Sequence, residues 1–406
     1  MSRDKPLPRL RFPEFTGQAL RDTELKTVTA ESTVRNGRKL PTTLVMGVTK
    51  ADGIVPMQER LIASNIARYK IVQKNWFAYN PMRLNIGSIA RWKGEGDILV
   101  SPDYIVFKCI DDASSSINPD YLDHFRRSEA WESFVTEGGD GSVRVRIYYK
   151  DLARLQLALP PPAEQQKIAD CLTSLDEVIA AQGRIVAALK AHKRGLMQQL
   201  FPREGETRPR LRFPEFRTAG EWERVTFGQA ATFHNGRAYK QEELLESGRY
   251  PVLRVGNFFT STTWYYSDLD LDETKYCENG DLLYAWSASF GPRIWRGEKS
   301  IYHYHIWKVM EKLGIDKNFL FITLENETEN MKAKTTNGLG IMHITKGAIE
   351  SWESSFPTIA EQRKVAVCLR NLDNTITAEI DRLKAFKTHK DGLMQQLFPA
   401  PEGAAA

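Results

Sequence analysis

Glycine turns that carry lysine or arginine are the features of this 406-residue chain with the clearest chemical use. NGRK at residues 36–39 and NGRAYK at 235–240 place cations on tight turns, and two glycine-rich basic stretches, GGDGSVRVR at 138–146 and KAKTTNGLGI at 332–341, are expected to be loops. Cations on such turns can approach the phosphates of a nucleic acid, whereas an ordinary solvated turn is the competing interpretation. The candidate contact residues are Arg35, Arg38, Lys39, Arg144, Arg146, Asn235, Arg237, Lys240, Lys332, Lys334 and Asn337.

Residues that could catalyse a reaction do not form a complete set. YNPM at 79–82 lacks the second proline and the aromatic residue of an NPPY motif, which holds a flipped adenine, and no glycine-rich methyl-donor loop accompanies it. The chain has no GxxxxGK[ST] phosphate loop. HYH at 303–305 places two imidazoles on one face of an expected strand, but further metal ligands are missing. The sequence therefore predicts no catalytic residue, no metal site and no cofactor bound by this chain.

The composition is that of a folded protein of two or three domains, with 42% hydrophobic and 26% charged residues. No secretory or membrane-spanning stretch is evident, so we expect a cytoplasmic protein. The four cysteines form no CxxC pair, which argues against a zinc site or a disulfide framework. A net charge of +5 is compatible with nucleic-acid binding but does not demonstrate it, because the basic residues are dispersed.

The elements that must position these residues come from a duplication. LMQQLFP occurs at 196–202 and again at 393–399, and AEQQK at 163–167 returns as AEQRK 197 positions later. PRLRFPEF occurs at 8–15 and at 209–216. A repeat near 200 residues is domain duplication rather than a solenoid array. Because the first PRLRFPEF would follow naturally from the last LMQQLFP, the chain reads as a circle cut once, with an internal pseudo-two-fold and with its ends close in space.

Each copy ends in the pattern of a long helix, with apolar residues at heptad spacing up to a closing proline. The expected length is about 57 Å at roughly 1.5 Å per residue. We expect the two helices to pair as an antiparallel coiled coil, although each could instead pack on its own globular domain. Gln182 and Glu379 interrupt the seams at matching places, where they either fix the register or lie at a solvent-exposed wide point. The seam residues are Ile168, Leu172, Leu175, Ile179, Val186, Leu189, Leu196, Val365, Leu369, Leu372, Ile376, Leu383, Phe386 and Leu393.

The segments between these markers are predicted to be α/β (α+β) domains built around sheets. Their β-like runs are DILVSPDYIVFKCI, YPVLRVGNFF, TTWYYS, DLLYAW and YHIWKVM, and their best helical stretches are YLDHFRRSEAWESFV and KNFLFITLENETENMK. GDILVS at 96–101 and GDLLYA at 280–285 are interpreted as a weak echo of the repeat. The predicted organisation is a globular domain at 1–160, a helix at 161–202, a second globular domain at 203–357, a second helix at 358–399 and a flexible tail at 400–406.

Two divergent domains, each followed by a near-identical helix opening on PxxxEQxxI, resemble the specificity subunit of type I restriction-modification systems. LPPPAEQQKIADCLTSLDEVI at 159–179 and FPTIAEQRKVAVCLRNLDNTI at 356–376 carry the resemblance. It implies two target-recognition domains, each reading one half of a bipartite, asymmetric double-stranded DNA target. The helices would be a spacer of about 57 Å, or roughly 17 base pairs at about 3.4 Å each.

The resemblance also implies partners. Two methyltransferase subunits would bind the specificity subunit, and restriction-translocase subunits would complete the complex. S-adenosylmethionine, ATP and Mg are expected only in those partners, and no membrane is involved. The alternative is a standalone DNA-modifying enzyme, a methyltransferase or nuclease, with an unrecognised catalytic motif.

Overall fold

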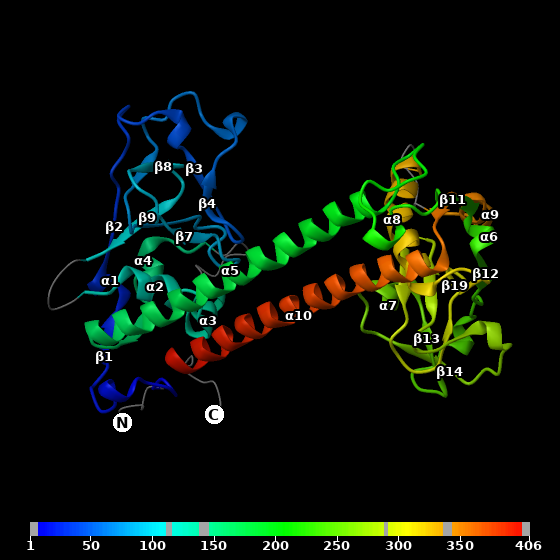
Figure 1. The fold of residues 1–406 in the computed structure, drawn as a ribbon. Helices are drawn as coiled ribbons and strands as arrows, with labels where there is room; N and C mark the ends of the chain where they lie inside the picture. The colour runs from blue at the N-terminus through cyan, green and yellow to red at the C-terminus, as the bar shows by residue number, and fades with distance from the viewer. Residues whose placement is uncertain (1–6, 111–115, 138–145, 288–290, 336–342, 400–406) are drawn as a thin grey trace. The chain divides into compact units, whose positions relative to one another are not determined.

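The protein, described by a computed structural model over residues 7–110, 116–137, 146–287, 291–335 and 343–399, has the predicted mixed α/β architecture. Its contacts divide it into two compact units (Figure 1). Unit 1 comprises Met1–Arg184 and Asp381–Ala406, and unit 2 comprises Ile185–Ile380. Each unit therefore contains part of both long helices. Within the described residues, no helix has the length and apolar character needed to cross a membrane.

Unit 1 is a small α/β domain with short strands. Its elements are η1 (Pro13–Phe15), β1 (Arg21–Glu24), α1 (Leu25–Val28), β2 (Thr29–Glu31), η2 (Thr42–Leu44), β3 (Met46–Thr49), β4 (Gly53–Pro56), η3 (Glu59–Leu61), β5 (Lys70–Val72), β6 (Phe77–Tyr79), β7 (Ile89–Arg91), β8 (Ile98–Val100), β9 (Ile105–Cys109), α2 (Pro119–Phe125), α3 (Glu129–Glu137), α4 (Tyr149–Leu152), β10 (Gln156–Leu159) and the first part of α5 (Pro162–Leu200).

Unit 2 repeats this plan. Its elements are η4 (Pro214–Phe216), β11 (Glu223–Thr226), α6 (Phe227–Ala230), β12 (Ala231–Asn235), η5 (Gln241–Glu243), β13 (Tyr250–Leu253), α7 (Val255–Phe259), β14 (Tyr265–Ser267), η6 (Glu273–Lys275), β15 (Tyr276–Cys277), β16 (Leu282–Ala285), β17 (Gly291–Ile294), β18 (Ser300–Tyr302), β19 (Ile306–Glu311), α8 (Lys317–Thr335), α9 (Lys346–Ser351), β20 (Glu353–Phe356) and the first part of α10 (Ile359–Leu397).

The two units share the order of their central sheets. Unit 1 has the antiparallel order β2-β9-β6-β7, and unit 2 has β12-β19-β16-β17. Unit 1 also has a two-stranded sheet of β5 and β8, which corresponds to β15 and β18 in unit 2. In unit 2 this sheet is extended by β13 and β14. The strand that leads into each long helix, β10 or β20, pairs antiparallel with the strand that opens the unit, β1 or β11. The duplication is therefore visible in the backbone, beyond the identical sequence markers.

The proposed echo between GDILVS and GDLLYA is wrong. Both glycines do lie in turns, with φ of 74° at Gly96 and 95° at Gly280. However, Gly96 precedes β8, which pairs with β5, whereas Gly280 precedes β16, which lies in the place that β6 holds in unit 1. The matching turns are those after Trp92 and Trp295. Each indole donates a hydrogen bond to a nearby carbonyl, and the glycine two residues later leaves room for the ring.

Three local expectations also differ from the structure. The second half of YPVLRVGNFF forms helix α7 rather than a strand, with the Phe258 amide donating to the Arg254 carbonyl. The stretch KAKTTNGLGI does not start as a loop, because α8 continues through Thr335. HYH at 303–305 lies in the tight connection between β18 and β19, so its imidazoles do not share a strand face. The two predicted helical stretches do form helices, as α2 with α3 and as α8.

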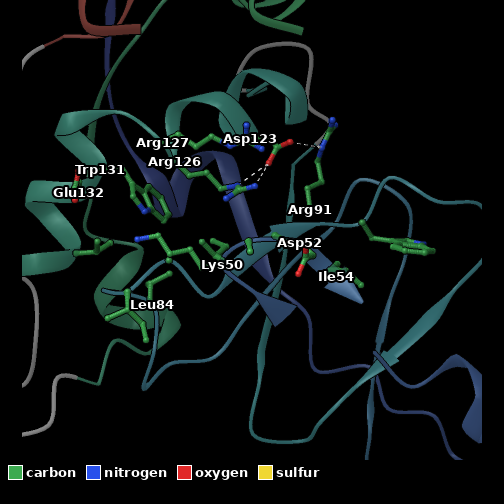
Figure 2. Close-up of a pocket in the computed structure, with 18 of the residues that line it drawn as sticks. Lys50, Asp52, Ile54, Leu84, Arg91, Asp123, Arg126, Arg127, Trp131 and Glu132 are labelled. Atoms are coloured by element: carbon green, nitrogen blue, oxygen red, sulfur yellow. Dashed lines mark hydrogen bonds and ion pairs between the residues drawn. The ribbon is translucent and has the colours of Figure 1, made fainter. Parts of the chain in front are cut away.

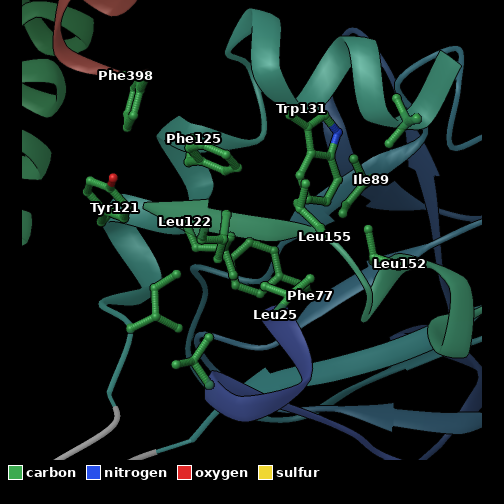
Figure 3. Close-up of a cluster of buried hydrophobic side chains, with 14 of the residues drawn as sticks. Leu25, Phe77, Ile89, Tyr121, Leu122, Phe125, Trp131, Leu152, Leu155 and Phe398 are labelled. Atoms are coloured by element: carbon green, nitrogen blue, oxygen red, sulfur yellow. The ribbon is translucent and has the colours of Figure 1, made fainter. Parts of the chain in front are cut away.

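The core of unit 1 lies between the central sheet and the helices α2 and α3 (Figure 3). Leu25, Phe77 and Trp131 contribute large buried side chains to it. Phe398, directly after α10, joins the same cluster, with its ring 5.4 Å from Tyr121 and 5.6 Å from Phe125 between centroids. The end of one long helix is thus anchored in the domain that precedes the other.

Candidate nucleic-acid interface and its supporting joints

The first functional feature is a buried ion pair that fixes the start of each long helix. In unit 1, Glu164 is 1% exposed and accepts hydrogen bonds of 2.9 and 2.5 Å from the Arg11 guanidinium. In unit 2, Glu361 is also 1% exposed and accepts two of 2.7 Å from Arg212. The hydrogen bond to the carboxylate raises the pKa of each arginine. PRLRFPEF and the AEQ motif recur together because each supplies one half of this joint.

The glutamine of the AEQ motif has a second fixed role. Gln165 donates to the carbonyl of Pro160 and accepts from the amide of Asn118, the residue that caps α2. Gln362 donates to Pro357 and accepts from the amide of Asp316, whose carboxylate accepts from the first amides of α8. Each long helix is thereby tied to the domain helix beside it.

PRLRFPEF also contacts the end of a long helix. The Leu10 amide donates to the carbonyl of Gln396 at 3.0 Å, and the Leu211 amide donates to that of Gln199 at 2.9 Å. Leu10 and Gln396 belong to opposite ends of the chain but to the same unit, which confirms the circular organisation expected from the repeat. In unit 2, Phe201 stacks on Phe319 at 5.6 Å, as Phe398 packs in unit 1. LMQQLFP therefore ends each long helix with residues that pack into the core of a globular domain.

The residues of the expected helix seam all lie on the less exposed side of α5 and α10. Ile168, Leu172, Val186, Val365, Leu369 and Ile376 are buried, and the other members are half-buried. Gln182 is 5% exposed, so the wide, solvated interpretation of that position is wrong. Glu379 is half-buried. Within each unit the low-numbered part of one helix meets the high-numbered part of the other, as in an antiparallel pair.

The predicted contact residues of unit 1 form an exposed turn. Gly37 and Arg38 have positive φ, and Asn36 is fully buried, with its side chain bonded to both the amide and the carbonyl of Leu40. Arg35, Arg38 and Lys39 are exposed around this anchor, although the Arg35 guanidinium donates to the Arg68 carbonyl. The turn can therefore present cations to an anion without rearranging.

The predicted contact residues of NGRAYK in unit 2 are less available, and this segment lies against the β18–β19 connection, whereas NGRK lies against the segment before β5. Arg237 forms a two-pronged ion pair with Glu243, at 2.7 and 3.1 Å, and the hydrogen bond raises the pKa of Arg237. Asn235 is the last residue of β12, and Lys240 is exposed near Glu242. Only Lys240 of these three presents a largely solvated charge.

The remaining predicted contacts are not gathered in one place. Arg146 is half-buried and precedes Ile147, whose amide donates to Pro81 in the YNPM turn. Lys332 is half-buried on α8 and pairs with Glu329. Arg144, Asn337 and the side chain of Lys334 lie outside the described residues. Of these five residues, the described part of the chain places the side chains of Arg146 and Lys332, which lie in different units.

Sequence reasoning missed a charged cavity of about 700 Å³ in unit 1 (Figure 2). It lies between the β3–β4 hairpin and β7 on one side and α2 and α3 on the other, and Lys50, Arg91 and Arg127 are among its lining residues. Lys50 and Arg127 are exposed, whereas the Arg91 side chain is 3% exposed. No local motif marks it, because its charges come from separate elements.

Asp123 organises the charges of this cavity. Its carboxylate, 2% exposed, lies 2.7 Å from Arg126, 2.9 Å from Lys93 and 3.7 Å from Arg91. Burial opposes its ionisation, but the surrounding cations outweigh burial and hold the pKa of Asp123 well below its usual range. The cluster ties α2 to the edge strand β7. Because Arg91 is paired with Asp120 and Asp123, and Arg126 with Asp123, the cavity is better explained as a structural joint than as an anion site.

The histidines of HYH do not form a metal site. Among the described residues no group of three histidine, cysteine or acidic side chains could hold a metal ion. Burial, with His305 and Arg254 nearby, lowers the pKa of His303 to about 4, and burial also lowers that of His305. Both rings are therefore neutral near pH 7, and each offers one hydrogen-bond donor and one acceptor.

Comparisons with known proteins point in one direction. The family model of the type I restriction modification DNA specificity domain matches residues 219–385. The type I restriction enzyme MjaVIII specificity subunit of Methanocaldococcus jannaschii is 29% identical over 191 residues, covering 46% of this chain and 43% of that protein. The putative MjaX specificity subunit of the same organism is 22% identical over 361 residues, covering 84% and 81%. The chain thus spans less than half the length of the first relative and about four fifths of the second.

Two solved structures share the fold. A chain from a study of complex assembly and conformational transition in a type I restriction-modification system superposes with a TM-score of 0.59 at 16% identity, covering 94% of this chain and 98% of that one. The crystal structure of the type I restriction-modification S subunit from M. genitalium gives 0.57 at 13% identity, covering 97% and 99%. At these identities the likeness concerns the fold.

Proposed function

We propose that this chain belongs to the family of type I restriction-modification specificity subunits and that it is the non-catalytic DNA-recognition subunit of such a system. Residues 1–160 and 203–357 are assigned as the two target-recognition domains. Residues 161–202 and 358–399 are the spacer helices that set the distance between the two half-sites. We also propose that the protein acts in the cytoplasm.

One observation carries this proposal: the joints are the same in both units, whereas the presented loops differ. The buried pairs Arg11–Glu164 and Arg212–Glu361 have the same geometry, and the central sheets have the same order. After β2, however, unit 1 presents NGRK against the segment before β5. After β12, unit 2 presents NGRAYK against the β18–β19 connection, with an internal Arg237–Glu243 pair. Matching joints and central sheets with different loops fit a protein that reads two different sequences and binds one kind of partner twice.

The proposed partners follow from the family. Two methyltransferase subunits would bind the two equivalent helix regions, and restriction-translocase subunits would join the full complex. S-adenosylmethionine, ATP and Mg would be bound by those subunits. Duplex DNA would be held by exposed cations such as Arg38, Lys39 and Lys240, while side chains in the grooves would read the bases.

Methyl transfer separates this proposal from a standalone enzyme. The purified chain, incubated with DNA and labelled S-adenosylmethionine, is expected to incorporate no label, and incorporation should appear when methyltransferase subunits are added. Methyltransferase subunits without this chain serve as the control and should leave the target unmodified. Incorporation by the purified chain alone would contradict the proposal.

A further inference from the structure

Four separate segments of unit 2 meet at one end of its sheets. The Gly236 amide donates to the carbonyl of Ile306, and the Tyr304 amide donates to that of Arg237. The His303 amide donates to Leu253, next to Arg254, and the Trp286 amide donates to His305 at 3.0 Å. These bonds bring together the segments after β12, β13 and β16 and the β18–β19 connection. We name Arg254, Trp286, His303, Tyr304 and His305 the aromatic turn cluster.

Glycine at position 236 makes this arrangement possible. A Cβ atom there would lie 2.4 Å from the carbonyl oxygens of both Tyr302 and His303, closer than real Cβ contacts. Only glycine lets the segment after β12 lie directly against the β18–β19 connection. The NGRAYK and HYH motifs, 68 residues apart in the sequence from Asn235 to His303, are therefore parts of one surface.

The rings of the cluster are held in place by one another and by the backbone. The His305 ring lies 3.9 Å from that of Tyr304 and 4.9 Å from that of Trp286 between centroids. The Trp286 indole donates to the Tyr304 carbonyl at 2.8 Å. Tyr304 is nevertheless 39% exposed. Polar aromatic groups that are both exposed and pre-positioned lose little conformational freedom when they bind.

The charge around the rings suits an anionic partner. Arg254 is exposed, and its guanidinium lies 5.2 Å from the ring centroid of Tyr265. Since the two imidazoles are neutral near pH 7, Arg254 supplies the positive charge of the cluster and the histidines supply hydrogen-bonding edges. A phosphate-binding cation beside donor and acceptor groups is the combination that duplex DNA requires, with phosphate contacts positioning the protein and groove contacts reading the bases.

The matching place in unit 1 shares a backbone hydrogen bond with unit 2 but has different side chains. The Ile147 amide donates to Pro81 after β6, as the Ile344 amide donates to Trp286 after β16, in both cases at 3.0 Å. Pro81 thus stands where unit 2 has Trp286, and Met82, which follows it, is 55% exposed. The joints of the two units correspond, but this end of the sheets differs, as expected if the two units recognise different DNA sequences.

We propose that the aromatic turn cluster contacts base edges of duplex DNA and determines the half-site read by the second unit. This inference rests on the proposed function and names the residues through which unit 2 would exercise it. Tyr304 and His305 are assigned as the specificity-determining side chains, Trp286 and His303 as positioning residues, and Arg254 as a phosphate contact.

The test uses the full chain assembled with its methyltransferase subunits on a randomised DNA pool. Y304A/H305A should relax base preference in one half-site by about tenfold or more, as expected when a base-pair contact is lost, and should leave the other half-site and the gap unchanged. R254Q should weaken binding. It should also reduce the slope of log affinity against log salt concentration by the amount expected for the loss of about one phosphate contact. R249Q is the matched control, because Arg249 precedes the same strand, β13, and lies 4.9 Å from the ring centroid of Tyr250.

The outcomes separate the two proposals. A bipartite wild-type target together with unchanged base preference in Y304A/H305A would overturn the cluster assignment and leave the proposed function intact. A wild-type complex without any bipartite target would overturn the proposed function itself. Weaker assembly with the methyltransferase subunits, at unchanged base preference, would make the cluster a protein interface and also overturn the inference. If the double variant fails to fold, Y304F and R254Q alter exposed groups only, and unchanged preference and salt dependence in both would equally reject the assignment.

Discussion

The Nζ atom of Lys193 in α5 lies 2.7 Å from Oδ1 of Asp373 in α10, so this lysine, which stands between the seam residues Leu189 and Leu196, is paired with an acid on the other helix. The duplication repeats this pair in unit 1, where Lys390 lies 2.5 Å from Asp176. A second acid, Glu325 of α8, lies 3.2 Å from Lys193. Each pair belongs wholly to one unit, and together they give each unit the same helix-to-helix contact.

We predict that the effects of charge-reversing substitutions at Lys193 and Asp373 on the free energy of unfolding are not additive. D373K should destabilise the protein because it places two cations together, and K193D/D373K should recover part of the loss, with a coupling of about 1 kcal/mol. The measurement is urea unfolding of the four proteins of the cycle. D381K, at an exposed acid of the same helix, is the control and should have little effect. Additive effects of the two substitutions would mean that the pair contributes nothing.

The pH range of this contribution follows from the pKa of Lys193. Burial disfavours the charged form, but the hydrogen bond to Asp373 and the charge of Glu325 outweigh burial and raise the pKa. The stabilisation is therefore complete below the pKa of an unfolded lysine, about 10.4, and is lost as the pH rises through the folded value. The coupling should accordingly be the same at pH 7 and pH 9.

The two aromatic residues that end LMQQLFP are predicted to stabilise different units. Phe398 is 2% exposed and packs on Tyr121 and Phe125, whereas Phe201 is 7% exposed and packs on Trp222 and Phe319. Truncating either to alanine should cost about 3–5 kcal/mol, as for other buried phenylalanines. Hydrogen exchange should accelerate in α2 for F398A and in α8 for F201A. Equal acceleration in both units for either variant would contradict separate docking sites.

His124 is predicted to make unit 1 sensitive to acid. It is 3% exposed, its Nε2 lies 3.0 Å from the Thr173 hydroxyl, and its Nδ1 is buried without a hydrogen-bond partner. Burial, reinforced by Lys390 and Arg127 against the opposing charges of Asp176 and Asp123, lowers its pKa to about 4. Between roughly pH 6.5 and 4 the unfolded chain takes up a proton that the folded one does not, so stability falls as the pH is lowered.

The measurement for His124 is the melting temperature between pH 7 and pH 5. H124Q should show a smaller fall over this range than the wild type, because the group that binds the extra proton on unfolding is gone. H389Q, at an exposed histidine of α10, should retain the wild-type fall. Identical pH profiles for H124Q and the wild type would remove His124 as the source of acid sensitivity.

Much of the scaffold could be predicted from the sequence because the duplication provides an internal comparison. The heptad pattern predicts α5 and α10, and the repeated LMQQLFP predicts a docking end. The Arg11–Glu164 joint was missed because its partners are 153 residues apart, although the joint recurrence of PRLRFPEF and AEQ in both copies was a usable signal. The false match between GDILVS and GDLLYA arose because similar turns can serve different strands, which only the sheet pairing reveals.

The candidate interface was harder to predict than the scaffold. Tyr304 and His305 were expected to alternate along a strand, and nothing local in the sequence shows that a turn places them beside Trp286. Arg237 was expected to present a free charge, but Glu243, six residues later, pairs with it. Side-chain pairing between loops depends on tertiary contacts. Local motifs therefore indicate which residue types occur in an interface, but not which individual residues belong to it.

The proposed spacer role of the helices can be tested by lengthening both helices while the heptad pattern of the seam is kept. Inserting seven residues after Gln182 and another seven after Glu379, which are equivalent positions, keeps the heptad register in both helices. Each insertion adds about 10.5 Å of helix, or roughly three base pairs of duplex DNA. A seven-residue insertion in one helix only is the control. It makes the two helices unequal in length, so that their seams no longer align along the whole pair, and it should impair folding.

The most direct measurement is a map of methylated adenines in DNA modified by the wild-type complex and by the complex with both insertions. We expect a bipartite target for the wild type. We expect the same two half-sites for the insertion variant, separated by a gap that is longer by about three base pairs. An unchanged gap in a folded, active variant would contradict the spacer role, and a single continuous wild-type target would contradict the two-reader account altogether.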